Sequence, residues 1–134
     1  MFTILVCGSR YYGDYDEVFE KLNSVCDRHK LWEGKYDPDG SNKANCRVIS
    51  GGRTMADQWA SGWAVSYSAR AQVCELDAKY GISAAAMRNA AMIEERPDIV
   101  LCFGKDSNTE DIISRAYKAH IPVQTFKQKP SAPF

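Results

Sequence analysis

Apolar runs of strand length alternate with helix-periodic segments along this chain. Residues 98–103 form the strongest run and residues 2–7 a second, both typical of strands covered on two faces of a parallel sheet. Shorter strands are expected at 47–50, 72–76 and 122–126. Five alternations predict a single α/β layered domain, with a mostly parallel sheet of about five strands flanked by crossover helices.

Four helical segments are predicted from apolar spacing and from the residues at their ends. Val18, Leu22 and Val25 recur on one helix face, which Asp14 or Asp16 can cap. Two further helices follow the second and fourth strands. The Ala-rich segment that starts near residue 83 is expected to be helical until Pro97 stops it.

One domain is expected over residues 1–126. Residues 33–46 are rich in turn residues with almost nothing to bury, and this predicts a surface loop excursion. Residues 127–134 follow the last strand and are predicted to form a C-terminal tail.

The charge balance argues against a nucleic-acid partner. The 134 residues include 17 Lys or Arg and 17 Asp or Glu, so the formal net charge is zero and no basic excess can neutralise a phosphate polymer. Hydrophobic residues make up 45% of the chain, which is ordinary for a globular domain with a packed core.

Localisation is inferred from apolar stretches and cysteines. No uninterrupted apolar run approaches the roughly 18 residues of a membrane span, and the N-terminus does not resemble a signal peptide. The five cysteines form an odd set without a C-x-x-C pair, which suits buried thiols in a reducing compartment. A cytoplasmic protein is therefore expected, with no membrane association.

Three glycine-bearing loops follow predicted strands. They are Gly8-Ser9-Arg10, Gly51-Gly52-Arg53-Thr54 and the segment from Gly104 to Thr109. Glycine allows close backbone approach to a ligand, and amides at a helix start favour anions. Because carboxyl ends of parallel strands share one edge, the loops together predict a phosphate cradle, although each alone is also explained by tight chain reversal.

Other chemistries find little support. The chain lacks G-x-G-x-x-G after its first strand and lacks a P-loop motif, so dinucleotide dehydrogenases and P-loop NTPases are excluded. His29 and His120 have no partner at metal-ligand spacing, and they assemble no convincing catalytic triad. Neither a metal nor a cofactor is expected.

Two pairs of aromatic residues and Arg88 are candidates either for ligand contact or for an ordinary structural role. Tyr11 and Tyr12 follow the first loop and are the better candidates for stacking on a base, whereas Trp59 and Trp63 have the spacing of core residues. Arg88 lies within a helical stretch, where base rates of charge favour solvent exposure.

A set of motifs that occurs in a fixed order across residues 2–124 favours a role for Arg88 in the site. They are Gly8-Ser9-Arg10, Gly51-Gly52-x-x-x-Ala56-Asp57-x-x-Ala60, Tyr80-Gly81, Arg88-Asn89-x-x-Met92, Asp98-x-x-Leu101-x-Phe103 and Asn108-Thr109-x-Asp111. This set resembles the YspA-like, YpsA-related branch of the SLOG superfamily, which also includes LOG-type phosphoribohydrolases and the core of DprA. The resemblance implies a Rossmann-like domain that binds nucleotides or their derivatives at its βα loops.

The resemblance, together with the loop chemistry, gives a set of predicted ligand-binding residues. They are Gly8, Ser9, Arg10, Tyr11, Gly51, Gly52, Arg53, Thr54, Asp57, Arg88, Asn89, Phe103, Gly104, Asn108 and Thr109.

The chain departs from the family pattern at two of its loops. Arg53, Thr54 and Met55 replace the usual A-R-G run, and Asn108 replaces a glycine. LOG-type enzymes have a glutamate three residues after the threonine, where this chain has Ile112. The nearest carboxylates, Glu110 and Asp111, point elsewhere because each helical residue turns about 100°. The departures favour binding over catalysis.

Two functions from different classes follow. The first is binding of a small phosphate-bearing nucleotide or derivative, such as an ADP-ribose-like molecule, for sensing or sequestration. The alternative is nucleoside monophosphate N-glycosidase activity, in which Arg88 orients phosphate or ribose and Asp111 or Glu110 stabilises the reacting sugar. A DprA-like single-strand DNA binder is weaker because the chain offers no basic track. The small residues of 84–91 suit a homo-oligomer contact or core packing equally.

Overall fold

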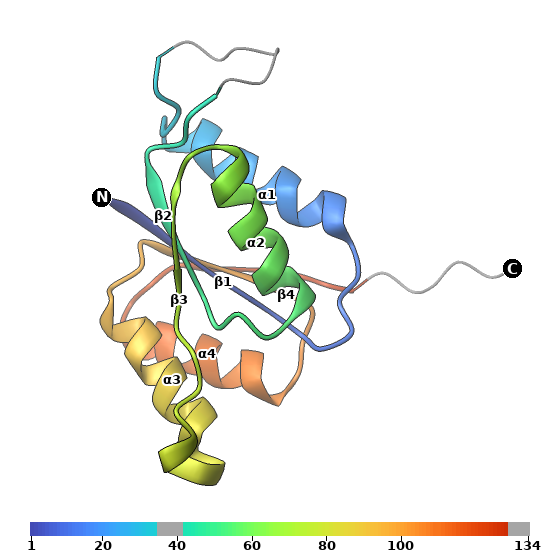
Figure 1. Cartoon of the computed structure of the whole chain (residues 1–134), viewed down its shortest axis with the longest axis vertical. Coiled ribbons are helices and arrows are strands. Elements are labelled where there is room, and N and C mark those ends of the chain that lie inside the picture. The colour runs from blue at the N-terminus through green and yellow to red at the C-terminus, as the bar shows by residue number, and fades with distance from the viewer. Residues whose placement is uncertain (35–41, 129–134) are drawn as a thin grey trace, which may run out of the picture.

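Five parallel strands form one sheet in a computed structural model that describes residues 1–34 and 42–128 (Figure 1). The strand order is β3-β2-β1-β4-β5. The strands are β1 (Phe2–Gly8), β2 (Cys46–Ser50), β3 (Arg70–Val73), β4 (Ile99–Phe103) and β5 (Val123–Phe126). The helices are α1 (Tyr15–Arg28), α2 (Met55–Ser66), α3 (Ala84–Glu94) and α4 (Ser107–Lys118), with a 3-10 segment at Ala78–Ser83. The expected α/β layered architecture is confirmed.

β1 is the central strand of the sheet, between β2 and β4. β1 pairs with β4 in a register that places Cys7 opposite Cys102 and Gly8 opposite Phe103. Helices α1 and α2 cover one face, and α3 and α4 cover the other (Figure 1). Strand order reverses between β1 and β4, which is where open sheets of this kind bind ligands.

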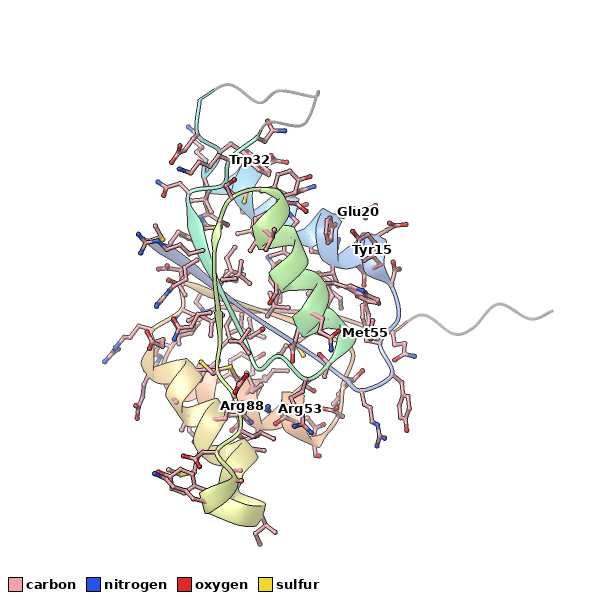
Figure 2. The ribbon with its side chains drawn as sticks, viewed as in Figure 1. Tyr15, Glu20, Trp32, Arg53, Met55 and Arg88 are labelled. Carbon is pink, nitrogen blue, oxygen red and sulfur yellow. The ribbon has the colours of Figure 1, made fainter. Side chains whose placement is uncertain are left out.

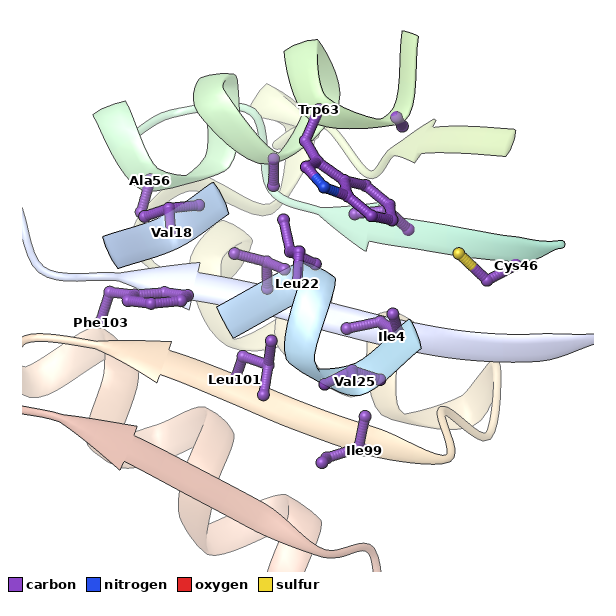
Figure 3. Packing of buried hydrophobic residues seen from close by; sticks show 14 of the residues in the cluster. Ile4, Val18, Leu22, Val25, Cys46, Ala56, Trp63, Ile99, Leu101 and Phe103 are labelled. Atoms are coloured by element: carbon purple, nitrogen blue, oxygen red, sulfur yellow. The ribbon is translucent and has the colours of Figure 1, made fainter. Parts of the chain in front are cut away.

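The larger apolar core lies under α1 and α2. Trp63 of α2 packs over the sheet beside Leu22 of α1, and Phe103 ends the row of β4 side chains that faces the same layer (Figure 3). A second cluster, which includes Met92 and Ile112, fills the space beneath α3 and α4.

Side-chain caps fix where three helices begin. Asp14 accepts from the Glu17 N–H at the start of α1, which settles the choice between Asp14 and Asp16. Thr54 and Asp57 form a capping box at α2, and Asp106 and Thr109 form another at α4. Two of these helix starts therefore lie directly after predicted ligand loops.

The second and third strands differ from the sequence expectations. β2 begins at Cys46, and Asn42 and Ala44 just before it are buried, so the expectation that 33–46 buries almost nothing is wrong for these residues. The Ala44 N–H donates to the Tyr67 carbonyl at 2.8 Å, which ties this segment to the end of α2. β3 occupies Arg70–Val73 rather than 72–76 because its pairing places Arg70 opposite Arg47.

The loop tip at residues 35–41 and the tail residues 129–134 lie outside the described residues, so the predicted excursion and tail stay predictions there. Within the described ranges, no helix has the length and apolar character that a membrane crossing requires. All five cysteines are free, and four of them are buried. The prediction of buried thiols is thus confirmed for most of them.

Candidate ligand-binding site at the carboxyl edge of the sheet

The three glycine-bearing loops meet at one edge of the sheet, as predicted. The Ser9 N–H donates to the Phe103 carbonyl at 2.8 Å, which joins the ends of β1 and β4. A β-carbon placed on Gly8 would lie 2.7 Å from that of Ala56 and 3.6 Å from Thr54 Oγ1, so the start of α2 approaches the same point. The carboxyl ends of β1, β2 and β4 therefore present their loops to one region.

The first and third loops form one packed unit. Gly104 has φ +83°, and a β-carbon there would stand 2.1 Å from Ser9 Oγ. The Arg10 N–H donates to Asp106 Oδ2 at 3.3 Å, while Asp106 Oδ1 accepts from the Thr109 N–H at 2.9 Å. Glycine at 104 is thus required both by its backbone conformation and by its contact with Ser9.

The second loop is held by Asp57. Its Oδ2 accepts from the N–H groups of Arg53 and Thr54 at 3.0 and 3.1 Å. Burial raises the pKa of Asp57, and the hydrogen bonds from Thr54 and Arg53 act in the opposite direction. Asp57 Oδ1 has no hydrogen-bond partner among the described residues. Asp57 therefore shapes the loop with one oxygen and leaves the other unused.

Arg88 reaches this edge from α3. Arg88 is only 8% exposed and its guanidinium lies against Gly51, so the alternative that base rates favour, a solvent-facing arginine, is wrong. Nη2 donates to Asn108 Oδ1 at 3.3 Å and to Asn89 Oδ1 at 3.5 Å, and Nε has no partner in the described part of the chain. Arg53 and Arg88 lie at the same end of the sheet (Figure 2), close enough for their charges to interact.

Burial is the main reason that the pKa of Arg88 is lowered from its usual value. The charge of Asp57 raises this pKa, whereas the like charge of Arg53 lowers it further. The arginine stays protonated at any physiological pH. It is consequently a buried cation whose nearby groups compensate it only in part.

An amide network connects α3 to α4. Asn89 Nδ2 donates to Asn108 Oδ1 and to Asp111 Oδ2, both at 2.9 Å, and Arg115 Nε donates to Asp111 Oδ2 at 2.9 Å. Partial burial raises the pKa of Asp111, but the hydrogen bonds from Asn89 and Arg115 outweigh it, so the net pKa lies below the ordinary value. Asp111 is thus an ionised acceptor that is already engaged.

Glu110 lies apart from this network. It is exposed, pairs with Lys105 at 3.4 Å and lines a cavity on the β5 side of α4. Of the three predicted catalytic residues, the structure therefore brings Arg88 and Asp111 together through Asn89 and Asn108, and places Glu110 on another side of the helix.

The two tyrosines after the first loop, Tyr11 and Tyr12, have different environments. Tyr11 is 75% exposed and has the Arg10 guanidinium over its ring at 5.6 Å. Tyr12 is only 2% exposed, lies 5.4 Å from Phe103 between ring centroids and hydrogen-bonds to Glu17, so the interpretation of Tyr12 as a base-stacking residue is wrong. Burial raises its pKa as well. The chain turns at Ser9 and directs this ring into the core.

Two predicted residues contribute through the backbone or through packing. Phe103 and Thr109 are fully buried, and Thr109 Oγ1 accepts from the Asp106 N–H at 2.9 Å. Among the described residues, no three His, Cys, Asp or Glu side chains gather in a way that could hold a metal ion.

A cavity of about 790 Å³ opens beside the third loop. Ser9 and Gly104 line it together with Ile113 and Tyr117 of α4 and Phe126 of β5. Sequence reasoning missed these last three residues. Apolar side chains at 113 and 117, adjacent to the buried stripe of Ile112 and Ala116, were a signal that α4 has a second apolar strip.

Comparison with known proteins supports the architecture. No model of a protein family matches the chain. The gene 61 protein of Mycobacterium phage D29 is 27% identical over 138 residues, an alignment that covers 97% of this chain and all of the phage protein. The crystal structure of the protein TM1055 superposes with a TM-score of 0.59 at 18% identity, and the match covers 92% of this chain and 72% of that one. The fold is Rossmann-like. The more specific YspA-like, YpsA-related branch stays a prediction.

Proposed function

We propose that this protein binds a nucleotide or nucleotide derivative with the loops at the carboxyl edge of its sheet, for sensing or sequestration. The observation that carries the proposal is Arg88, a buried guanidinium laid against Gly51 with its Nε unpaired in the described structure. Burying a cation is costly unless an anion compensates it. A phosphate group supplies that anion and accepts from the guanidinium.

The second loop carries polar atoms that the described residues do not pair. In the described part of the chain, three buried side-chain atoms lack hydrogen-bond partners: Ser50 Oγ, Asp57 Oδ1 and Arg88 Nε. Ser50 ends β2, Asp57 caps the next helix and Arg88 covers the intervening Gly51, so the three residues surround one loop. Arg88 needs an acceptor, and Asp57 needs a donor. A phosphorylated sugar carries both, since its phosphate accepts and its hydroxyls donate.

Two further features favour an anion here. Arg53 adds a second guanidinium whose like charge disfavours Arg88 when no anion lies between or beside them. The first turn of α4 begins at Ser107. Asp106 already accepts from the Thr109 N–H, which leaves the N–H groups of Ser107 and Asn108 without an acceptor inside the helix. Together they extend the polar edge from β2 to β4.

Equilibrium binding tests the proposal. Isothermal titration with nucleoside monophosphates, ADP-ribose, ribose 5-phosphate and inorganic phosphate is expected to give sub-millimolar binding for at least one organic phosphate. Arg88→Ala should weaken it at least tenfold, because a charge-assisted hydrogen bond contributes about 1.5–3 kcal/mol. Arg88→Lys, which keeps the charge but loses the planar fork, should retain part of the affinity.

Arg70→Ala is the matched control, since Arg70 is exposed on β3, away from the glycine-bearing loops. Circular dichroism melting shows that each variant is folded. Wild-type protein that binds none of these ligands at 1 mM, or folded Arg88→Ala with wild-type affinity, would overturn the proposal.

Glu110 supports a second candidate, nucleoside monophosphate N-glycosidase activity. It is a carboxylate on the wall of the cavity beside the third loop, whereas Asp111 is committed to Asn89 and Arg115. An ionised carboxylate near a reacting sugar stabilises an oxocarbenium-like centre. Chromatography for released base after incubation with each monophosphate tests this activity. Glu110→Gln should stop release while leaving binding intact, and no release from wild-type protein excludes the candidate.

The oligomeric state stays a prediction. Ala86, Met87 and Ala91 are exposed on α3, which leaves part of the Ala-rich face free of core contacts in the described structure. Size-exclusion chromatography with light scattering measures whether a homo-oligomer forms.

A further inference from the structure

β5 forms one edge of the sheet, and half of its backbone groups face away from β4. The Val100 N–H donates to the Pro122 carbonyl at 2.9 Å, and the Gly104 N–H donates to the Phe126 carbonyl at 2.7 Å. Even-numbered residues of this segment therefore face β4, because alternate residues of a parallel strand direct their N–H and C=O groups to the same side. The described sheet has no strand to pair with the outward-facing groups, which belong to Val123, Thr125 and Lys127.

One flank of α4 is uncovered beside this strand edge. The base of α4 packs on the sheet through Ile112 and Ala116, and Asp111 faces α3, to which it is hydrogen-bonded. Each helical residue turns about 100°, so the flank opposite α3 carries positions 110, 113, 114 and 117. These four residues and Thr125 of β5 line the cavity of about 790 Å³, which we call the α4–β5 groove. Tyr117 in this groove is 63% exposed.

We propose that the α4–β5 groove is the contact surface between two copies of this chain, related by a twofold axis. The outward edge of β5 pairs antiparallel with the same edge of the partner's β5, and α4 lies beside the partner's α4. The two sheets then form one continuous sheet. This contact differs from the α3 face considered above and does not depend on which ligand binds near Arg88.

The order of residues along the uncovered flank of α4 is complementary to itself in reverse. In an antiparallel helix pair, each residue meets the one that lies equally far on the other side of the twofold axis. With the axis between positions 113 and 114, Ile113 meets the partner's Ser114, and Tyr117 meets the partner's Glu110. The small Ser114 leaves room for Ile113, and the Tyr117 hydroxyl can donate to the carboxylate. Each contact occurs twice, as a twofold interface requires.

The charges favour a second copy over a charged peptide as the occupant. Glu110 lies in the first turn of α4 and Lys118 in its last turn. An antiparallel pair therefore brings opposite charges and opposite ends of the helix dipoles together at both ends. Lys105 in the groove is already paired with Glu110 at 3.4 Å, so little free charge is left to attract a charged peptide. The chain as a whole has no net charge, so two copies do not repel each other.

The strand edge has the same centre as the helix flank. Thr125 lines the groove together with Ile113 and Ser114, so an axis between these two helix positions also passes near Thr125. Pairing centred there joins the N–H and C=O groups of Thr125 to those of the partner's Thr125, and Val123 meets the partner's Lys127. β5 has only four residues, so the strand pairing needs the helix contact beside it to be stable.

The molecular mass in solution tests the inference. Light scattering on a size-exclusion column should give the mass of two chains at micromolar concentrations. Tyr117→Glu places like charges opposite each other and should raise the dissociation constant at least about tenfold. Thr125→Pro removes an outward-facing N–H without touching the ladder to β4, and it should also weaken the dimer. Met87→Glu, on the exposed face of α3, is the matched control and should stay dimeric.

A cross-link tests the register. In the proposed pair, the two substituted residues of Thr125→Cys face each other across the axis, at a Cα separation that a disulfide can span. Mild oxidation with oxidised glutathione should give a cross-linked dimer on a non-reducing gel. Arg70→Cys, on the opposite edge of the sheet, should give no more cross-linking than wild-type protein.

Circular dichroism melting shows which variants are folded, and if Thr125→Pro does not fold, Tyr117→Glu and the cross-link decide. A wild-type protein that is monomeric at micromolar concentrations would overturn the proposal and leave the groove to a different partner. A dimer that Met87→Glu dissociates and folded Tyr117→Glu leaves intact would place the contact on α3, and would also overturn it. None of these results requires ligand binding, so failure of either proposal leaves the other standing.

Discussion

Arg88 lies so close to Gly51 that a β-carbon on the glycine would stand 3.0 Å from Arg88 Nη1 and 3.1 Å from Cζ. The contact joins the end of β2 to α3, two elements that are far apart in the sequence. Only a residue without a side chain leaves room for the guanidinium in this position. Gly51 therefore controls where the buried cation sits.

Gly51→Ala is expected to displace Arg88 and to weaken ligand binding about tenfold, with a small loss of stability. The backbone of Gly51 does not have a positive φ, so the fold itself tolerates alanine. The guanidinium is the flexible partner and moves away from its place. Isothermal titration and thermal melting measure the two effects, and unchanged affinity would contradict this role for Gly51.

Gly62→Ala is a control variant that should raise the stability of the protein instead of lowering it. Gly62 is exposed within α2, and a β-carbon there meets nothing within 4 Å. Alanine in a helix interior is favoured over glycine by about 0.5–1 kcal/mol. This variant should melt at a higher temperature and bind ligand as the wild type does.

Gly104→Ala should destabilise the protein by more than about 2 kcal/mol, because a positive φ is strained for alanine and the new β-carbon would collide with Ser9. Gly81 also has a positive φ, of +56°, but nothing lies within 4 Å of its β-carbon position. Its ψ of −126° lies outside the left-handed α region, so Gly81→Ala carries backbone strain of about 1–3 kcal/mol but no collision, and its loss of stability should be smaller than that of Gly104→Ala. Urea unfolding of the two variants separates strain from collision, and equal losses would show that the contact with Ser9 is unimportant.

Asp57 and Asp111 should affect the pH dependence of stability in opposite directions. Burial holds the folded pKa of Asp57 above its ordinary value, so its favourable contribution is present at low pH and is lost as pH rises through the folded pKa. The lowered folded pKa of Asp111 gives a contribution that is present above the ordinary pKa and is lost as pH falls through the folded value.

Asp57→Asn should therefore gain stability relative to wild type as pH rises from about 3 to 7, and Asp111→Asn should lose it over the same range. Free energies of unfolding from urea titrations at several pH values measure both differences. If the difference between wild type and variant does not change with pH, the raised pKa of Asp57 or the lowered pKa of Asp111, respectively, is contradicted.

Thiol labelling should distinguish Cys74 from the other cysteines. Cys74 is partly exposed, and the other four are buried. Burial raises the pKa of Cys74, so even this thiol should react slowly with Ellman's reagent near pH 8. One equivalent is expected in native protein and five in denaturant. More than one rapidly reacting thiol in the native state would argue against the packing around Cys7 and Cys102.

The sheet was largely predictable because its central strands need no long-range information. β1 and β4 are covered on both faces, so their apolar runs are continuous in the sequence. β3 is an edge strand with exposed Arg70 and Ala71, and its weak pattern allowed a shift of about two residues. Its position is set by pairing with β2, which the local sequence does not encode.

The site was predictable at its loops and less so at its side chains. Glycines after strands indicated the edge, and family resemblance singled out Arg88 and Asn89. Base rates placed Arg88 in solvent, because its contacts with Gly51 and Asn108 come from distant parts of the chain. The direction of Tyr12 depends on the turn at Ser9, and the groove beside Tyr117 depends on how α4 lies along β5.

Helix α3 buries Ala84, Arg88, Asn89 and Met92, so half of its buried positions are polar. Hydrogen bonds to α4 therefore hold this helix in place more than buried apolar area does. When α3 moves away from α4, these hydrogen bonds are lost at the same time. Amide hydrogens of α3 should thus exchange with deuterium earlier than those of β1 and β4. Occupation of the edge near Arg88 would slow exchange first in this helix, which makes α3 the natural place to detect an unknown guest.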